Sequence, residues 1–409
     1  MSDSSGALRN IGVLATCRAE GAQRDIHAIA DGAVAWEGGR IAWAGADADL
    51  PSRWRPEAVD AGGALVVPGL VDCHTHLAFG GWRADEFEQR ALGAGYLEIA
   101  RAGGGIASTM RRTRELDEAA LYERAAAFAV EMRQLGVTTI ECKSGYGLDT
   151  ATELRLLRAY ARLAGHGDVR IVPTFLGAHV VPPDYRERRD EYVRLVAEEM
   201  IPAVAAEGLA RCCDVFVEDS AFSVGEARRI LQAGKAAGLA PKLHADQLTS
   251  SGGAELAAEV GALSADHLEH ASDTGIAAMA RAGVVAVSLP LATLYLRQPP
   301  MPARRFIEAG VAVAVATDFN PGSAPSYHLP LALTLACTLQ RMTPAEALKG
   351  ATVIAARAVG EELECGSIEA GKSADFAIID APDVNTWLYH FRPNACVRTV
   401  FRGRTVWAA

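Results

Sequence analysis

The chain has 409 residues, and its 40 Lys and Arg against 50 Asp and Glu give a formal net charge of −10 at pH 7. A hydrophobic share of 50% with 22% charged residues excludes a disordered or collagen-like chain, because enough apolar surface is present to offset the entropy lost on folding. The acidic balance argues against a nucleic-acid partner, whose phosphates require a basic face.

The amino-terminal segment has no basic stretch followed by an apolar one, and no apolar run approaches the roughly 20 residues of a membrane-spanning helix. We therefore expect a cytoplasmic protein with no membrane partner. The eight cysteines have neither CxxC nor zinc-ribbon spacing, so we expect them to be reduced and mostly buried. The adjacent pair Cys212 and Cys213 is left without an assigned role.

Both ends of the chain predict β-structure. Residues 1–67 hold short apolar runs broken by glycine turns, and the segment AVAWEGGRIAWAG is typical of a β-hairpin. The tail, residues 364–409, has the same character. Because neither end has enough strands to bury a sheet face alone, we predict that residues 1–67 and 364–409 form one composite β-sandwich.

Residues 68–363 alternate short apolar runs with segments of helical periodicity, many of which end at a glycine. This pattern predicts an α/β fold, a (β/α)8 TIM barrel, whose strands are buried on both faces. An open, doubly wound sheet is the alternative. The eight predicted strands are residues 70–73, 138–142, 169–177, 213–218, 241–245, 263–268, 284–289 and 311–317.

Polar residues follow several of these runs at the strand ends, where a parallel barrel has its active site. His74 and His76 are two residues apart, so on an extended backbone both imidazoles reach the same side. Taken singly, each residue could be a hydrogen-bonded core histidine or a capping aspartate. The set as a whole predicts a metal site of the kind that zinc or iron accepts; its later members are His179, His244, His267 and Asp318.

These strand ends carry a family resemblance. The segments VVPGLVDCHTHL, HAD, ADHLEH and ATDFNPG resemble the amidohydrolase superfamily of metal-dependent barrels. Within it, the chain is similar to the imidazolonepropionase family, whose members open the imidazolone ring in histidine degradation. The more specific segments are FGGWRADEFEQRALGAGYLEIARAGGGI, ECKSGYGLD, TFLGAHVVPPDY, KLHADQL and ATDFNPGSAPS.

The resemblance implies a metal site. Its ligands would be His74, His76, His244 and Asp318, the residues also favoured by strand position. Two-metal relatives carry a carboxylated lysine, but the segment ECKSG around Lys143 does not resemble their motif. We therefore expect one ion, and the ligand types do not distinguish zinc from iron.

The resemblance also implies residues that bind a substrate carrying a propionate. The planar guanidinium of Arg83 suits a carboxylate, and the alternative is a surface arginine paired with Asp85 or Glu86. For residues 320–323 the alternative is an ordinary Pro-Gly turn, and both interpretations can hold together. The remaining substrate-binding residues would be Tyr146, His179, Gln247, Asn320, Gly322 and Ser323.

His267 matches the residue assigned to general acid/base catalysis, for which an imidazole is suited. Gln247 departs from the HxxE pattern of related ring deaminases. An amide cannot take up or release a proton, so we assign Gln247 to substrate binding and count it against a deaminase.

The resulting hypothesis is metal-dependent hydrolysis of the cyclic amide of 4-imidazolone-5-propanoate to N-formimidoyl-L-glutamate, with either Asp318 or His267 as the first proton acceptor. A homodimer is the expected assembly. The alternatives are a hydrolase or deaminase acting on another cyclic amide or amidine, and a barrel that binds metal without turnover.

Overall fold

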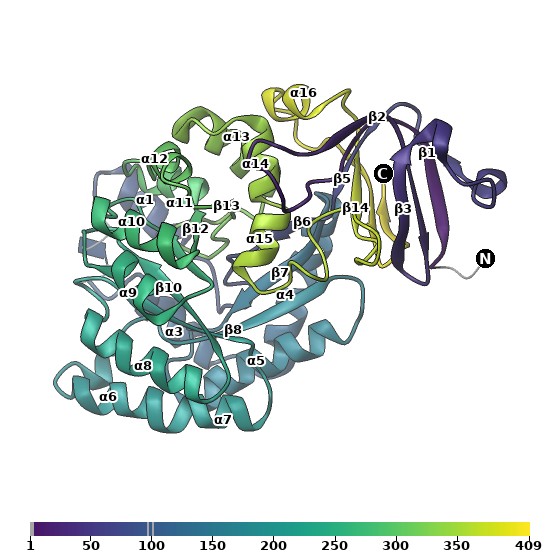
Figure 1. The fold of residues 1–409 in the computed structure, drawn as a ribbon. Helices are drawn as coiled ribbons and strands as arrows, with labels where there is room; N and C mark the ends of the chain where they lie inside the picture. Colours follow the sequence, from purple (N-terminus) through teal and green to yellow (C-terminus); the bar gives the residue numbers. More distant parts are fainter. Residues whose placement is uncertain (1–3, 96–97, 100–101) are drawn as a thin grey trace.

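The computed structural model describes residues 4–95, 98–99 and 102–409. Residues 96–97 and 100–101, which belong to the family-specific segment 79–106, lie outside the described residues. Figure 1 shows a barrel surrounded by helices and, beside it, a sheet that contains both chain ends.

The barrel consists of eight parallel strands in sequential order. A parallel bridge between Thr75 and Phe319 joins the ends of the first and last strands. This arrangement confirms the predicted (β/α)8 fold over the open doubly wound sheet. The strands are β6 (Leu70–Asp72), β7 (Val137–Lys143), β8 (Arg170–Ala178), β9 (Cys212–Val217), β10 (Ala240–Ala245), β11 (Ser264–His267), β12 (Val285–Ser288) and β13 (Val313–Val315).

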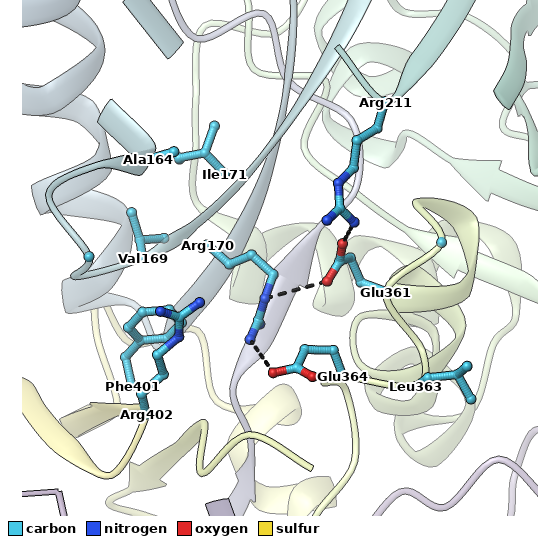
Figure 2. Close-up of a pocket in the computed structure, with 12 residues that line it drawn as sticks. Ala164, Val169, Arg170, Ile171, Arg211, Glu361, Leu363, Glu364, Phe401 and Arg402 are labelled. Carbon is cyan, nitrogen blue, oxygen red and sulfur yellow. Dashed lines mark hydrogen bonds and ion pairs between the residues drawn. The ribbon is translucent and has the colours of Figure 1, made fainter. Parts of the chain in front are cut away.

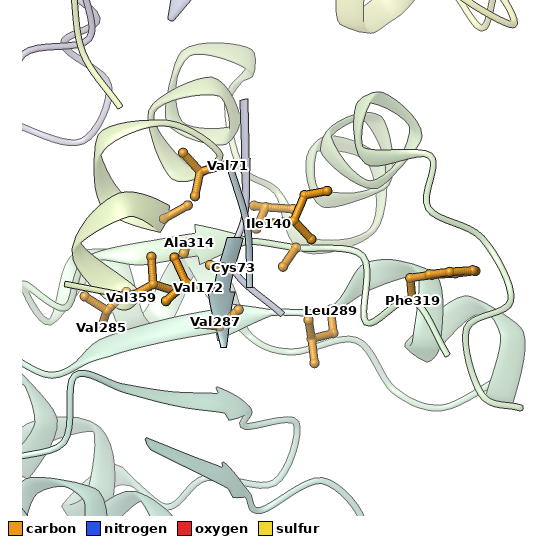
Figure 3. Packing of buried hydrophobic residues seen from close by; sticks show 14 of the residues in the cluster. Val71, Cys73, Ile140, Val172, Val285, Val287, Leu289, Ala314, Phe319 and Val359 are labelled. Carbon is orange, nitrogen blue, oxygen red and sulfur yellow. The ribbon is translucent and has the colours of Figure 1, made fainter. Parts of the chain in front are cut away.

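The barrel strands are buried almost throughout, which explains why they read as continuous apolar runs. Figure 3 shows Val71, Cys73, Ile140 and Val287 among the apolar residues of this packing, which also includes Val359 after α15. Successive strand residues point to opposite faces, so Ile140 lies on the face opposite to Glu141 and Lys143. The strand ends are where such a barrel binds ligands.

Helices follow the strands and cover the barrel (Figure 1). Ser223 and Thr343 each begin a helix with a reciprocal capping box, to Glu226 and Glu346. None of the helices among the described residues combines the length and apolarity needed to cross a lipid bilayer. The helices are α1 (Ala84–Ala91), α3 (Ile106–Arg114), α4 (Glu118–Gln134), α5 (Thr150–Ala164), α6 (Arg189–Leu195), α7 (Ile201–Ala206), α8 (Val224–Ala236), α9 (Gly253–Val260), α10 (Asp273–Ala282), α11 (Pro290–Leu296), α12 (Ala303–Glu308), α13 (Leu329–Gln340), α14 (Pro344–Gly350), α15 (Val353–Ala358) and α16 (Val384–Tyr389).

The two chain ends share one eight-stranded sheet, as the fold prediction requires. The ends meet where β5 pairs antiparallel with β14. Apolar clusters around Val34 and around Ala33 lie on opposite faces, because neighbouring residues of a strand point to opposite sides. The domain boundaries at 67/68 and 363/364 stay a prediction. The strands are β1 (Gly6–Ala15), β2 (Ala28–Glu37), β3 (Arg40–Ala46), β4 (Val59–Asp60), β5 (Leu65–Pro68), β14 (Phe376–Ile379), β15 (Cys396–Phe401) and β16 (Arg404–Ala408).

All eight cysteines are free, and seven are buried. Cys212 and Cys213 are neighbours on β9, so their side chains point to opposite faces. Burial raises the pKa of the Cys212 thiol to about 11, which leaves it protonated and inert at neutral pH. The adjacent pair is thus accounted for as packing.

Arginine–carboxylate pairs join the barrel to the end sheet at the amino-terminal ends of the strands. Figure 2 shows Arg170 and Arg211 converging on Glu361 beside a cavity of about 470 Å³. Arg170 is buried, and its Nη1 donates to Asp375 Oδ2 at 2.9 Å, while its Nε lies 3.5 Å from Glu361 Oε2. The side chain of Arg211 is 62% exposed. Asp375 precedes β14, so the buried pair of Arg170 and Asp375 connects the barrel to the end sheet.

Replacing the buried arginine should cost much more stability than replacing the exposed one. Arg170→Met leaves Asp375 buried without its cation, and we expect the free energy of unfolding to fall by about 3–5 kcal/mol. Arg211→Met removes the exposed partner of Glu361 and should change the free energy of unfolding by only about 0–1 kcal/mol. Urea unfolding of both variants measures the difference, and equal effects would contradict this description of the junction.

Candidate metal centre and active site

The structure gathers the predicted site residues at the carboxyl ends of the barrel strands. His74 is fully buried behind the others, and Gly322 lies against Arg83. The remaining predicted residues line one cavity of about 30 Å³: His76, Arg83, Tyr146, His179, His244, Gln247, His267, Asp318, Asn320 and Ser323.

Four side chains from three strand ends form a cluster suited to a cation. Nε2 of His74 lies 3.4 Å, and Nε2 of His76 lies 3.6 Å, from Oδ1 of Asp318. His244 joins from β10, with its ring centroid 4.5 Å from that of His74. These side chains are all buried, and their ligand atoms fall into groups within 4.8 Å of one another.

Two buried carboxylates orient the histidines. Asp266 Oδ2 lies 2.6 Å from Nδ1 of His74, and Asp214 Oδ1 lies 3.1 Å from Nδ1 of His244. An ionised carboxylate only accepts hydrogen bonds, so each Nδ1 donates and each Nε2 keeps its lone pair. Both Nε2 atoms are buried and have no hydrogen-bond partner among the described residues. This donor set fits a metal ion.

Asp214 and Asp266 are not among the residues predicted from the sequence. Each is a carboxylate within an apolar run, CDVFVE and LSADHL, and this is the signal that marks them. A carboxylate is almost never fully buried without a partner, so its presence in a barrel strand indicates a cation or a histidine nearby.

Beneath the histidines, Lys143 balances the two aspartates. Its Nζ lies 2.7 Å from Asp214 Oδ2, 3.5 Å from Asp266 Oδ2 and 3.0 Å from Glu141. Burial lowers the pKa of Lys143, but the three carboxylates raise it more, and the net shift is well upward. The ammonium therefore stays charged, and a charged amine has no lone pair with which to become carboxylated.

Burial sets the protonation of the histidine cluster. It lowers the pKa of His74 and of His76 well below the ordinary value, and neighbouring imidazoles and Lys143 lower both further. It also raises the pKa of Asp318. Neutral imidazoles are the form that binds metal, so His74 and His76 are ready for a cation without loss of a proton.

Arg83 is buried, contrary to the alternative of a surface arginine. Its Nε and Nη1 have no hydrogen-bond partner among the described residues, and Glu86 Oε2 is 3.9 Å from Nε. Glu86 instead accepts from Gly105 N and from Arg90, whose Nη1 donates to Gly322 O at 2.7 Å. A Cβ on Gly322 would lie 1.3 Å from Arg83 Nη2, so only glycine allows this approach.

Tyr146 and His179 form an aromatic wall beside the cluster. The ring of His179 stacks on that of His76 with centroids 5.1 Å apart, and the centroid of the Tyr146 ring lies 5.4 Å from that of His179. Nδ1 of His179 donates to Gly145 O at 3.0 Å, which directs Nε2 away from that backbone. Gly145 has φ +101°, a conformation that favours glycine.

The segment 318–323 forms the turn foreseen as one alternative. Oδ1 of Asn320 accepts from Gly322 N and Ser323 N, both at 2.8 Å, and its Nδ2 donates to Ser323 Oγ. Asn320 and Ser323 nevertheless line the cavity, so the turn does not preclude contact with a ligand.

Gln247 lies on the loop that follows β10. Glu218 accepts from the backbone N–H groups of Leu248 and Thr249, and Asp246 accepts from Ser251 N at 2.8 Å. The loop is thereby held in place, with the Gln247 side chain at the cavity wall.

Backbone strain accompanies the site residues. Asp246, His267, Leu268 and Asp318 all have φ between +51° and +80°, which is costly for residues with a Cβ. Each lies at the carboxyl end of a barrel strand. Such strain persists only where the surrounding contacts impose it, and here those contacts belong to the site.

Removal of one orienting carboxylate should weaken metal binding. Asp266→Asn keeps the shape but removes the negative charge that balances Lys143 and strengthens the hydrogen bond from His74, and we expect the metal dissociation constant to rise by roughly 10–100-fold. Competition with a chromophoric chelator measures this constant. Asp273→Asn, an exposed aspartate after the same strand, is the control. An unchanged constant in the Asp266 variant would refute the orienting role.

The comparisons with known proteins identify the family. The model of the amidohydrolase family matches residues 65–406. The chain is 50% identical over 381 residues to the imidazolonepropionase of Cupriavidus taiwanensis, which covers 92% of this chain and 91% of that protein. It is 52% identical over 356 residues to the imidazolonepropionase of Myxococcus xanthus, and this match covers 86% of this chain and 84% of that protein.

Solved structures similar to this one share its fold. An adenosine deaminase from Xanthomonas campestris with bound zinc has a TM-score of 0.71 at 19% identity, over 98% of this chain and 92% of that chain. Guanine deaminase from E. coli has a TM-score of 0.71 at 17% identity, over 99% of both chains. The sequence matches over nearly the whole length are the more specific finding, and they confirm the resemblance: the chain belongs to the amidohydrolase family and, within it, to the imidazolonepropionases.

Proposed function

We propose that this chain hydrolyses the cyclic amide C–N bond of 4-imidazolone-5-propanoate to give N-formimidoyl-L-glutamate. The observation that carries the proposal is the buried, unsatisfied guanidinium of Arg83 at the wall of the cavity that holds the histidine cluster. A buried arginine with free N–H groups suits a carboxylate, and the propionate of this substrate supplies one. A neutral purine or pyrimidine does not.

The family and the His/Asp cluster together support a metal cofactor. We propose one ion, zinc or iron, with His74, His76, His244 and Asp318 as its ligands. The pairing of Lys143 Nζ with three carboxylates supports a single ion. When bound, the ion supplies Lewis-acid chemistry, because it acidifies water and polarises a carbonyl.

The remaining cavity residues would bind and orient the substrate. Arg83 would hold the propionate, and Tyr146 and His179 would donate hydrogen bonds to the carboxylate or the ring. Gln247 would contact a ring nitrogen or carbonyl without exchanging a proton, which argues against a deaminase. Contacts to the opened ring would come from Asn320, Gly322 and Ser323.

The reaction needs one proton transfer, for which we propose His267 and Asp318. The water oxygen bonds to the ring carbonyl carbon, the bond from that carbon to the ring nitrogen breaks, and a proton passes from the water to the nitrogen. Either His267 accepts that proton and delivers it to the nitrogen, or Asp318 accepts it and passes it to the nitrogen through His267 or a water. The ring of His267 lies 5.4 Å from that of His244, beside the ligand cluster.

The other proposals concern the context of the enzyme. We propose a cytoplasmic location, a homodimer, and no nucleic-acid or membrane partner. The net charge of −10 supports the absence of a nucleic-acid partner. For the homodimer, the support is that two-fold dimers are the commonest soluble assemblies.

Turnover of freshly made 4-imidazolone-5-propanoate by metal-analysed protein tests the activity. We expect rapid loss of its ultraviolet absorbance, a product one water heavier, and no loss above the spontaneous rate after chelator treatment. Fully metal-loaded protein that leaves the absorbance unchanged would refute the proposed substrate.

Arg83→Met should raise KM strongly, because a charge-assisted hydrogen bond is worth roughly 1.5–3 kcal/mol, or about 10–100-fold in binding. Arg158→Met, which removes a surface arginine paired with Glu207, is the matched control. Steady-state kinetics measures both. An unchanged KM in the Arg83 variant would exclude it as the carboxylate anchor.

His267→Ala should lower kcat by about 100-fold or more while leaving the metal content intact, since general acid/base catalysis typically contributes about 10²–10⁴-fold. Metal analysis and kcat are measured on the same preparation. Near-normal turnover would remove His267 from the mechanism.

A further inference from the structure

A carboxylate behind His267 has no part in the proton transfer proposed for His267 and Asp318. The Glu269 side chain is only 1% exposed, although Glu269 follows β11 in a loop. Lys143 and Lys242 are within ion-pair distance of Asp266, whereas Glu269 is within that distance of His267 alone among the described residues. A buried carboxylate beside a single imidazole calls for a functional explanation.

The facing atoms of this pair are both unsatisfied. Oε2 of Glu269 lies 4.0 Å from Nδ1 of His267, and both atoms are buried with no hydrogen-bond partner among the described residues. An unmade hydrogen bond in the interior costs roughly 1–3 kcal/mol for each group. A small rotation of either side chain would join the two atoms, and catalytic hydrogen bonds are often long before the substrate binds.

The other oxygen of Glu269 is held in place. Oε1 accepts from Thr293 Oγ1 at 3.0 Å, and Thr293 is itself buried in α11. Burial raises the pKa of the Glu269 carboxyl to about 8, and the hydrogen bond from Thr293 lowers it only in part. Oε2 is therefore costly to leave unpaired whether or not it carries the proton.

The backbone between the two side chains is constrained to keep them adjacent. His267 has φ +80° and Leu268 has φ +67°, and two consecutive left-handed residues other than glycine are strained. The end of β10 imposes this turn, because Leu268 N donates to Ala245 O and His270 N donates to Asp246 O. The strained turn places the carboxylate behind the imidazole.

We propose that Glu269 is a positioning residue for His267: its Oε2 hydrogen-bonds Nδ1 and holds the ring with Nε2 toward the cluster and the substrate. The inference rests on the proposed role of His267 in proton transfer. It assigns to Glu269 no contact with the substrate and no metal ligand. Its effect should therefore appear in kcat, with KM and metal affinity unchanged.

Glu269→Ala and Glu269→Gln in the zinc-loaded full-length chain test the proposal. A glutamine amide can both accept and donate, so it preserves the hydrogen bond to Nδ1 that alanine abolishes. We expect alanine to lower kcat by roughly 10–100-fold, as loss of an orienting partner typically does, and glutamine to stay within about tenfold of the unchanged chain. The control is Glu255→Gln, which changes a carboxylate that accepts hydrogen bonds from Ser272 and Thr274.

Nitrogen-15 NMR of the His267 ring, assigned with His267→Ala, reports the contact independently of turnover. We expect the Nδ1 resonance to shift in the alanine variant and to stay near its original position in the glutamine variant.

Unchanged kcat and ring resonances in Glu269→Ala would overturn the proposal. So would equal losses in both variants accompanied by reduced metal content or melting temperature, since these indicate a purely structural role. If the unchanged chain does not hydrolyse the imidazolone, the proposed function fails, but the ring resonances still decide whether Glu269 holds His267.

Discussion

The charge pairing around Lys143 is the interaction on which the site depends. Three buried carboxylates surround two buried ammonium groups, those of Lys143 and Lys242, so one negative charge is in excess. With ionised Asp318 the excess becomes two, which the proposed metal ion would offset. Buried charges are tolerated only when paired. The same aspartates orient His74 and His244, so one set of atoms both balances the buried charge and orients two of the proposed metal ligands.

The scaffold makes this arrangement rigid. The orienting aspartates and Lys143 lie within barrel strands, not on loops, and each of these strands, β7, β9 and β11, is paired with a strand on both sides. The groups proposed to contact the substrate lie one layer further out, on the strand ends and loops. A hydrogen bond from Arg90 to the Gly322 carbonyl connects α1 to the segment 318–323. The missing side chain of Gly322 leaves room for Arg83. Strained φ values at His267 and Asp318 occur where strand and loop meet.

Much of the fold and of the candidate site could be predicted from the sequence, for physical reasons. Strands buried on both faces read as apolar runs, and their polar terminal residues, such as His244 and Asp318, point to the site without knowledge of any distance. The partners of these residues could not be predicted. Asp266 reaches His74 across 192 positions in the chain, and Arg90 reaches Gly322 across 232. Glu269 follows a strand end in the segment ADHLEH, but only the strained turn brings its carboxylate back toward His267.

The most direct test of the proposed reaction is the position at which water enters the ring. With turnover of 4-imidazolone-5-propanoate in ¹⁸O-water, attack on the ring carbonyl places one ¹⁸O atom in the new carboxylate of N-formimidoyl-L-glutamate, and fragment masses locate it there. Attack on the amidine carbon, as a deaminase-like reaction requires, would place the label in the one-carbon group. A label in that group would contradict attack on the ring carbonyl and therefore the proposed reaction.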